Sequence, residues 1–540
     1  MSEILFHYHR VNPTTWVYLA SLLMIGLFFK FGRFWSVRNL DLVLLILLAP
    51  GLLMAQYGRE AGNKADQLAR LEAQQTPDAE ETASSDSPTE PSDDPAAKID
   101  LIVHEPEAEP PFPEAEDPTT DPAEMPIEEP APEEAESEQA DELADEAADQ
   151  EGVSTPAQQA RAVERFGFIW LFAISSLLLL RLVLDPTMVR RPLLEPNLTS
   201  GGLTFSLCSL FVFLMANVIT SDPAKLTSVE AATIEQIVPV DTAVEESVPA
   251  LPPGPGYAIL KYIPSIPTSP LVPEGVPRTR SQRTYVLAAK TIAILCHLAV
   301  VLGIVAIGYW HFGNTKTGVG VATLYLLLPY TAQMTGHIEH VIPAALLVWA
   351  ILCYRRPLTA GMFIGLATSL MYYPLFLLPL WISFYWRRGL MRFVAGVAVT
   401  LLLMAVSLVF MPEASYWENL KNMFGLWPPL QEGLEGFWGL VLDPPYRVPV
   451  LAAFVALSGT LALWPAQKNL GTLLSCSAAV MVATQFWHGY GGGLYVAWYL
   501  PLLLLTVFRP NLEDRVALAV LGEGWGARRA IRAASEFKAA

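Results

Sequence analysis

The chain has 540 residues, of which 52% are apolar or aromatic and only 16% are charged, and its mean hydropathy is +0.36. This balance excludes an ordinary water-soluble globular protein of this size and predicts a membrane protein. The net charge is -19, but 31 of the 53 acidic residues lie between Glu60 and Glu151, and the rest of the chain carries +9. The apolar composition predicts the lipid bilayer as a partner. No stretch has the basic composition of a nucleic-acid-binding surface, so no nucleic-acid partner is predicted.

Twelve apolar segments predict membrane-spanning helices, because a helix needs about 20 apolar residues to cross a bilayer and fewer when its flanking residues snorkel. The eighth segment contains Tyr372-Tyr373-Pro374, and proline disfavours helix at the preceding residue, so we expect two short helices with a tip at Tyr373-Pro374. The predicted fold is therefore all-α, a polytopic integral membrane protein with about 12–13 passes that include this broken hairpin. The twelve segments are residues 16–29, 40–54, 166–184, 203–219, 285–309, 319–334, 341–354, 358–386, 393–411, 448–464, 470–486 and 494–508.

A long acidic insertion rich in Pro, Glu and Ala separates the second span from the third. Its residues, 58–161, include too few apolar side chains to form a core that offsets the entropy of ordering, so we expect disorder. It is a solvated linker or, alternatively, binds divalent cations weakly or acts as a spacer in the cell envelope. The predicted organisation is two transmembrane helices in 1–57, the acidic segment in 58–161, two more helices in 162–219, an extracytoplasmic Pro-rich loop in 220–284, a transmembrane body in 285–508 and a tail in 509–540.

Lys and Arg gather in short loops and in the tail, and such clusters are retained on the cytoplasmic side. Arg356 and Arg387 flank the broken hairpin, so both of its ends are expected on that side. We expect a protein of the cytoplasmic membrane, with its N-terminus and acidic segment outside and its C-terminus inside. Asp41 and Lys290 lie at the ends of spans, where their charges can snorkel to the interface.

Three stretches place polar or aromatic residues at the predicted outer ends of the spans. The first contains His337, Glu339 and His340. The two imidazoles suit proton transfer or contact with a phosphate. An alternative interpretation is that these polar residues simply cap a short helix at the membrane interface. Their His-x-Glu-His spacing is not that of a metalloprotease, and the four cysteines lie in apolar runs, so no metal site is predicted.

The other two stretches are the hairpin tip, with Tyr372 and Tyr373, and a turn with His488, Tyr490 and three glycines. Tyrosines at an interface either anchor the protein in the headgroup layer or line a binding site. The glycines allow a sugar or lipid phosphate to approach the backbone closely, or they simply make a flexible turn.

Three motifs, in their order along the chain, resemble those of the polyprenyl-phosphate-sugar-dependent, mannosyltransferase-like glycosyltransferases of the C superfold. They are Gly336-His337-Ile338-Glu339, the run from Gly365-Leu366-Ala367 to Tyr372-Tyr373-Pro374, and the turn from His488 to Pro501, so the resemblance covers residues 285–508. It implies transfer of a hexose from a polyprenyl-phosphate carrier at the outer face. It also implies substrate binding by His337, His340, Tyr372, Tyr373, His488 and Tyr490. Among the outer carboxylates, Glu339 is the first candidate for a catalytic role.

The chain departs from this family at two places. Met371 stands where the family usually has a lysine, and the first outer loop, which holds the family's catalytic acid, is here the acidic segment. Glu413, Glu418 and Asp443 are therefore further candidates for the acid. The alternatives are a non-enzymatic scaffold or envelope protein with a degenerate glycosyltransferase-like fold, or a transporter. The sequence indicates no particular cofactor.

Overall fold

The computed structural model describes residues 11–75, 155–188, 196–220, 280–410, 415–426, 433–466 and 468–510. In these ranges the regular secondary structure is helical, apart from one isolated bridge between Glu435 and Tyr490, and the all-α prediction is confirmed. The chain forms two compact units, one of Met1–Ala61 with Ala160–Ala540 and one of Gly62–Gln159.

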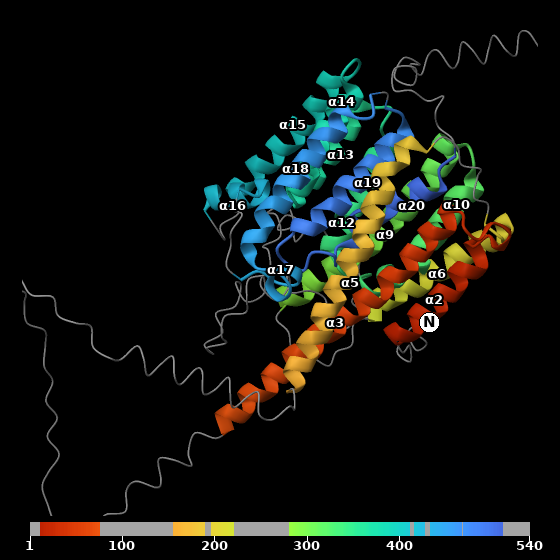
Figure 1. Cartoon of the computed structure of the whole chain (residues 1–540). Coiled ribbons are helices and arrows are strands. Elements are labelled where there is room, and N and C mark those ends of the chain that lie inside the picture. Colours follow the sequence, from red (N-terminus) through yellow and green to blue (C-terminus); the bar gives the residue numbers. More distant parts are fainter. Residues whose placement is uncertain are drawn as a thin grey trace, which may run out of the picture. The chain divides into compact units, whose positions relative to one another are not determined.

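The described helices up to residue 307 are α2 (Pro13–Phe28), α3 (Val37–Gln75), α5 (Pro156–Leu184), α6 (Ser200–Thr220) and α9 (Arg280–Ile307) (Figure 1). The C-terminal half contains α10 (Thr315–Leu327), α11 (Pro329–Gln333), α12 (Ile338–Leu352), α13 (Pro357–Leu370), α14 (Leu378–Tyr385), α15 (Leu390–Ser407), α16 (Tyr416–Phe424), α17 (Phe437–Leu440), α18 (Arg447–Leu463), α19 (Leu470–Trp487) and α20 (Leu500–Phe508).

Local sequence determines several helix starts. The side chain of Asn12 accepts a hydrogen bond from the Thr14 amide ahead of α2, and Asn314 caps α10 in the same way. Asn469 and Thr472 form a reciprocal capping box at the start of α19. Each cap satisfies amides that the first helical turn leaves without partners, which matters most where water is scarce.

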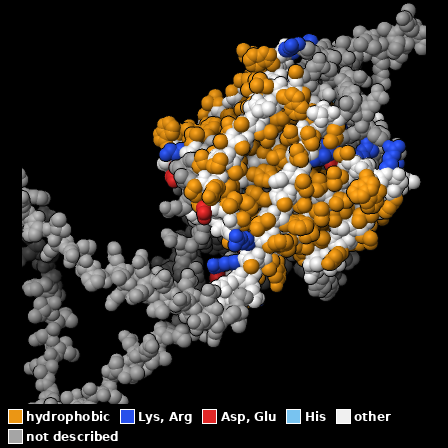
Figure 2. Space-filling model, viewed as in Figure 1, with side chains coloured by type: hydrophobic (Ala, Val, Ile, Leu, Met, Phe, Trp, Pro, Cys, Tyr) orange, Lys and Arg blue, Asp and Glu red, His pale blue; other side chains and the backbone are white. Residues whose placement is uncertain are grey.

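Seven helices in the described part of the chain are long and apolar enough to cross a membrane, and four shorter apolar helices accompany them. Helix α15 leaves large apolar side chains exposed, among them Leu402 and Leu403, and apolar side chains cover most of the visible face of the bundle in Figure 2. A surface of this kind suits lipid and not water. The protein is a multi-pass α-helical membrane protein.

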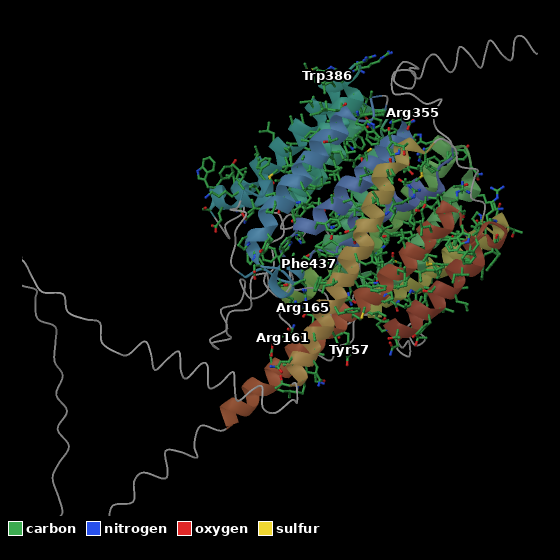
Figure 3. All side chains as sticks on the ribbon, viewed as in Figure 1. Tyr57, Arg161, Arg165, Arg355, Trp386 and Phe437 are labelled. Atoms are coloured by element: carbon green, nitrogen blue, oxygen red, sulfur yellow. The ribbon has the colours of Figure 1, made fainter. Side chains whose placement is uncertain are left out.

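The broken hairpin is present as the sequence predicts. Helix α13 ends at Leu370, a 3₁₀ turn covers Tyr373–Leu377, and α14 follows. The Tyr385 hydroxyl donates a hydrogen bond of 2.5 Å to the Tyr354 carbonyl, so the two ends of the hairpin lie together. Arg355 and Trp386 accordingly lie at the same end of the bundle (Figure 3), which confirms that both basic clusters share one side.

The prediction that Asp41 and Lys290 snorkel is wrong, because both side chains are buried. Lys290 donates to the Ile219 carbonyl at 2.9 Å. Asp41 belongs to a buried ionic cluster of four residues from α3, α5, the turn after α5 and the end of α20. Its ion pairs are Arg181–Asp41 at 2.8 Å, Arg181–Asp185 at 2.9 Å and Arg509–Asp185 at 2.5 Å.

The prediction of disorder is wrong at the two ends of the acidic segment. Helix α3 continues to Gln75 and α5 begins at Pro156, so residues 58–75 and 156–161 are helical. Gly58 and Gly167 allow these helices to pack closely, because a Cβ at Gly58 would lie 2.5 Å from the Glu164 amide. Residues 76–154, at the centre of the predicted acidic insertion, lie outside the described residues, as do 221–279 of the Pro-rich loop and 511–540 of the tail.

Helix α19 connects the ionic cluster with the residues that the sequence singles out. Its start lies against the ionic cluster, since a Cβ at Gly471 would meet the Arg509 guanidinium, and its end leads into His488. From Gly471 to His488 the helical rise gives about 26 Å, which is close to the thickness of a bilayer's hydrocarbon core. The two polar regions thus lie at opposite ends of a nearly fully buried helix.

Candidate functional site

Side chains from three separate parts of the chain meet at the far end of α19. They come from α11 and the start of α12, from the hairpin tip, and from the turn between α19 and α20. We name them together the histidine–tyrosine cluster: Tyr330, His337, Glu339, His340, Tyr372, Tyr373, His488, Tyr495 and Trp498.

Glu339 lies between two histidines at the first turn of α12. Its Oε1 is 3.1 Å from Nδ1 of His337 and 3.8 Å from Nε2 of His340. The Tyr330 hydroxyl is 2.5 Å from the other ring nitrogen of His340. A carboxylate is also favourable at this position because the start of a helix carries partial positive charge.

The turn between α19 and α20 connects this group to the hairpin tip. Tyr495 stacks on His340, with ring centroids 4.7 Å apart, and its ring centroid is 4.8 Å from that of His488. His488 is hydrogen-bonded through Nδ1 to the Tyr373 hydroxyl, which accepts a hydrogen bond of 3.0 Å from Tyr372. Residues that are up to 168 positions apart in the sequence therefore form one continuous set of contacts.

The glycines of this turn give it a defined shape. Gly491 and Gly493 have φ angles of +68° and +96°, which are strained for other residues. Gly492 leaves no space for a side chain, since a Cβ there would lie 2.3 Å from the Gln485 carbonyl. Gln485 Oε1 also accepts hydrogen bonds from the amides of Gly493 and Tyr495. These φ angles, the close contact and the hydrogen bonds together define the backbone path of the turn.

Two guanidinium groups flank the same turn. A Cβ on Gly489 would lie 3.1 Å from Cζ of Arg447, whose Nε donates 2.7 Å to the Trp487 carbonyl. A Cβ on Gly491 would lie 3.5 Å from Nη2 of Arg59. Arg59 pairs with Glu164 at 3.1 Å and with Glu435 at 3.6 Å.

Glu435 is held at the turn by its backbone. Its amide donates to the Gly489 carbonyl at 2.9 Å, and its carbonyl accepts from the Gly491 amide at 3.4 Å. The loop before α18 is in this way attached to the turn after α19. Two carboxylates therefore lie near Tyr495, Glu339 within the cluster and Glu435 beside it. Burial raises the pKa of the Tyr495 phenol, and the negative charges of Glu339 and Glu435 raise it further.

Burial and the neighbouring charged residues shift the pKa values of His488 and Tyr490. Burial lowers the pKa of His488 to about 3, and the positive charge of Arg447 acts in the same direction. His488 is therefore neutral near pH 7, because its folded pKa lies far below that pH. Burial raises the pKa of Tyr490, while Arg447 opposes and Glu435 reinforces that change.

All the site residues that the sequence singles out lie in or beside this cluster, with Tyr490 at its edge, where its ring centroid is 6.4 Å from that of His488. The further candidates for the catalytic acid are not part of the cluster as defined: Glu418 and Asp443 are exposed, and Glu413 lies outside the described residues. Sequence reasoning missed Arg59, Glu435, Arg447 and Tyr330. The first three come from segments with no motif. A charge close to an apolar span is the only sequence signal for Arg59 and Arg447, and Glu435 has no such signal.

The fold and the cluster define a multi-pass membrane protein with a polar, aromatic-rich site at one end of its bundle. Comparison with family models, with curated proteins and with solved structures finds no match for this chain.

Proposed function

We propose that the histidine–tyrosine cluster binds a polyprenyl-phosphate sugar and transfers the sugar to an acceptor hydroxyl at the outer face of the membrane. One observation supports this most: the three motifs of the resemblance meet through direct contacts. Trp498 links them, because its Nε1 donates 3.0 Å to the Glu339 carbonyl while its ring lies 5.3 Å from that of Tyr373.

In the proposed reaction, the acceptor oxygen attacks the anomeric carbon of the sugar, and the bond from that carbon to the phosphate oxygen breaks. The polyprenyl phosphate leaves with the electron pair of the broken bond. A carboxylate takes the proton of the acceptor hydroxyl, and Glu339 is our candidate for that base. Glu435 is the second carboxylate at the site.

The leaving phosphate needs cationic or hydrogen-bonding groups to stabilise its charge. Met371, which replaces the lysine usual in the resembling family, cannot provide a cation. Arg59 and Arg447 flank the glycine turn beside His488, and guanidinium groups bind phosphate oxygens in bidentate geometry. We propose that these two arginines compensate for Met371.

A transport function has less support. The buried charges of the ionic cluster pair two aspartates with two arginines, so the cluster is neutral as a whole. It lies at the opposite end of α19 from the histidine–tyrosine cluster, where it joins α3, α5 and α20. A compensated set of charges that connects helices favours a structural role.

The test is release of polyprenyl phosphate by the purified full-length protein, given a panel of polyprenyl-phosphate hexoses and a membrane lipid extract as acceptor. This product is common to every sugar, so the assay does not require the sugar to be known. We expect Glu339→Gln to lower the rate by about 100-fold or more, because an amide cannot accept the proton.

The matched control is Glu60→Gln, which changes an exposed carboxylate of α3 and should leave the rate unchanged. No release by the wild-type protein with any donor would contradict the proposed function. Equal rates for wild type and Glu339→Gln would exclude Glu339 as the base.

A further inference from the structure

We propose that His337, Glu339 and His340 form a binding site for a divalent transition-metal cation of the Zn²⁺ type. One ligand atom from each of these residues lies within 4.8 Å of the other two. This goes beyond the proposed sugar transfer and does not depend on it. When the ion is bound, Glu339 is a ligand, and Glu435 is then the carboxylate that takes the acceptor's proton. The sequence predicts no metal here, since its spacing matches no known metal motif, but spatial distance and not sequence spacing decides whether three donors reach one ion.

The separations of the donor atoms are close to those that a cation requires. Zn²⁺ binds nitrogen and oxygen at about 2.0–2.2 Å, so two ligands of a tetrahedral ion are about 3.4 Å apart. Glu339 Oε1 is 3.1 Å from His337 Nδ1 and 3.8 Å from His340 Nε2. The ligand atoms of the two histidines lie within 4.8 Å of each other, so binding one ion requires these rings to move closer together.

The orientation of His340 is fixed from both sides of its ring. Its Nδ1 is hydrogen-bonded to the Tyr330 hydroxyl at 2.5 Å, and the ring stacks on Tyr495 with an interplanar angle of 12°. A histidine that binds a metal through one nitrogen usually forms a hydrogen bond through the other, which selects the tautomer and directs the free lone pair. Here that arrangement leaves Nε2 as the nitrogen nearest to Glu339.

The donor set indicates which class of cation is bound. Two imidazole nitrogens and one carboxylate suit Zn²⁺ and similar transition metals, whereas Mg²⁺ and Ca²⁺ prefer oxygen ligands. Three protein ligands leave the fourth tetrahedral position open for water or for an oxygen of a bound molecule. The side chains of His337 and Glu339 are 26% and 14% exposed, so an ion can reach the site.

The alternative is a hydrogen-bonded helix start that holds no ion, with Glu339 stabilised by His337 and by the helix dipole. The two interpretations differ in a measurable property. A metal site binds one equivalent of Zn²⁺ with an affinity that depends on all three side chains, while a helix start binds none.

The experiment is a Zn²⁺ titration of the full-length protein in detergent against a chromophoric chelator, with excess Mg²⁺ to occupy the carboxylates of residues 58–161. We expect one tight equivalent. Its affinity should fall by more than about 100-fold in His340→Ala and in Glu339→Gln, and by about tenfold in Tyr330→Phe, which removes the hydrogen bond to the ligand histidine. Glu339→Gln keeps the shape of the side chain and serves if His340→Ala does not fold.

The control variant replaces His7, His9 and His104 with alanine, because these three histidines are not among the proposed ligands and an imidazole can bind metal on its own. It should retain the tight equivalent. The proposal is overturned if the wild-type protein binds no stoichiometric Zn²⁺, if His340→Ala and Glu339→Gln bind like wild type, or if the control alone loses binding. As a second readout, bound Co²⁺ should give the intense visible absorption of a tetrahedral site and not the weak absorption of octahedral oxygen coordination.

The metal site and the transferase reaction can fail separately. A protein that binds Zn²⁺ tightly but releases no polyprenyl phosphate supports the site and contradicts the proposed function. A protein that binds no Zn²⁺ and transfers sugar at an unchanged rate after chelation contradicts the metal site and supports the proposed function.

Discussion

Arg181 lies among apolar side chains of the bundle with an aspartate on either side, Asp41 and Asp185. The interior of a membrane protein penalises an isolated charge strongly, so charged residues there pair with one another. Arg509 adds the second positive charge, and the four residues together connect helices that are far apart in the sequence. Each charge in the set is tolerated because of the others.

At the residue scale we therefore predict that Arg181→Ala destabilises the protein, since it leaves two buried carboxylates with one arginine. The loss in free energy of unfolding should be about 3–5 kcal/mol, as for other broken buried ion pairs. Denaturant or thermal unfolding in detergent measures it. Arg165→Ala removes an exposed arginine from the same helix and should change stability by no more than about 0.5 kcal/mol. Equal effects of the two substitutions would show that the ionic cluster is not stabilised by its pairing.

At the scale of elements, α13 and α15 pack closely because glycines lie where they cross. A Cβ on Gly361 would be 2.2 Å from the Phe393 carbonyl oxygen, and one on Gly396 would be 2.2 Å from that of Leu358. Backbone atoms cannot move aside as the end of a side chain can. Close backbone approach at small residues is a common way for membrane helices to associate, since lipid offers no hydrophobic force between them.

We predict that Gly396→Ala destabilises the protein by about 1–3 kcal/mol, because the added methyl group pushes the two helices apart. The matched control is Gly459→Ala on α18, where a Cβ would meet nothing within 4 Å. That substitution should be neutral or stabilise by up to about 1 kcal/mol, through the higher helix propensity of alanine. Thermal unfolding midpoints in the same detergent compare the two. The packing argument fails if the ranking is reversed.

The elements were more predictable from the sequence than the site was. Apolar run length finds the spans, and Pro374 marks the break in the hairpin, because both signals are local. The last span was predicted from residue 494, but α20 begins at Leu500 since the glycine turn extends to Tyr499. Glu435 reaches the site through backbone hydrogen bonds to Gly489 and Gly491 and through its ion pair with Arg59, and no local pattern predicts these contacts.

At the scale of the whole molecule, we predict that the histidine–tyrosine cluster faces the outside and the ionic cluster faces the cytoplasm. The reason is the basic residues at the hairpin ends, which are retained inside. Single cysteines replace Ala162 or Arg388, both exposed, in a background without the four native cysteines. In intact cells an impermeant thiol reagent should label Cys at 162 and spare Cys at 388. The opposite pattern would invert the topology and place the proposed reaction on the cytoplasmic side.

The broken hairpin also constrains how the protein is made. With both basic ends on one side, we expect α13 and α14 to insert into the bilayer together as one hairpin. Neither helix is expected to cross the bilayer without the other. Its tip leaves backbone groups outside a regular helix, and hydrocarbon cannot hydrogen-bond them or the tyrosine hydroxyls. The partner of Tyr373 is His488, which the ribosome adds 115 residues later. Until α19 is inserted, the tip lacks the hydrogen bond from Tyr373 to His488, so we expect a chain that is truncated before α19 to be degraded faster than the full chain in a pulse-chase measurement.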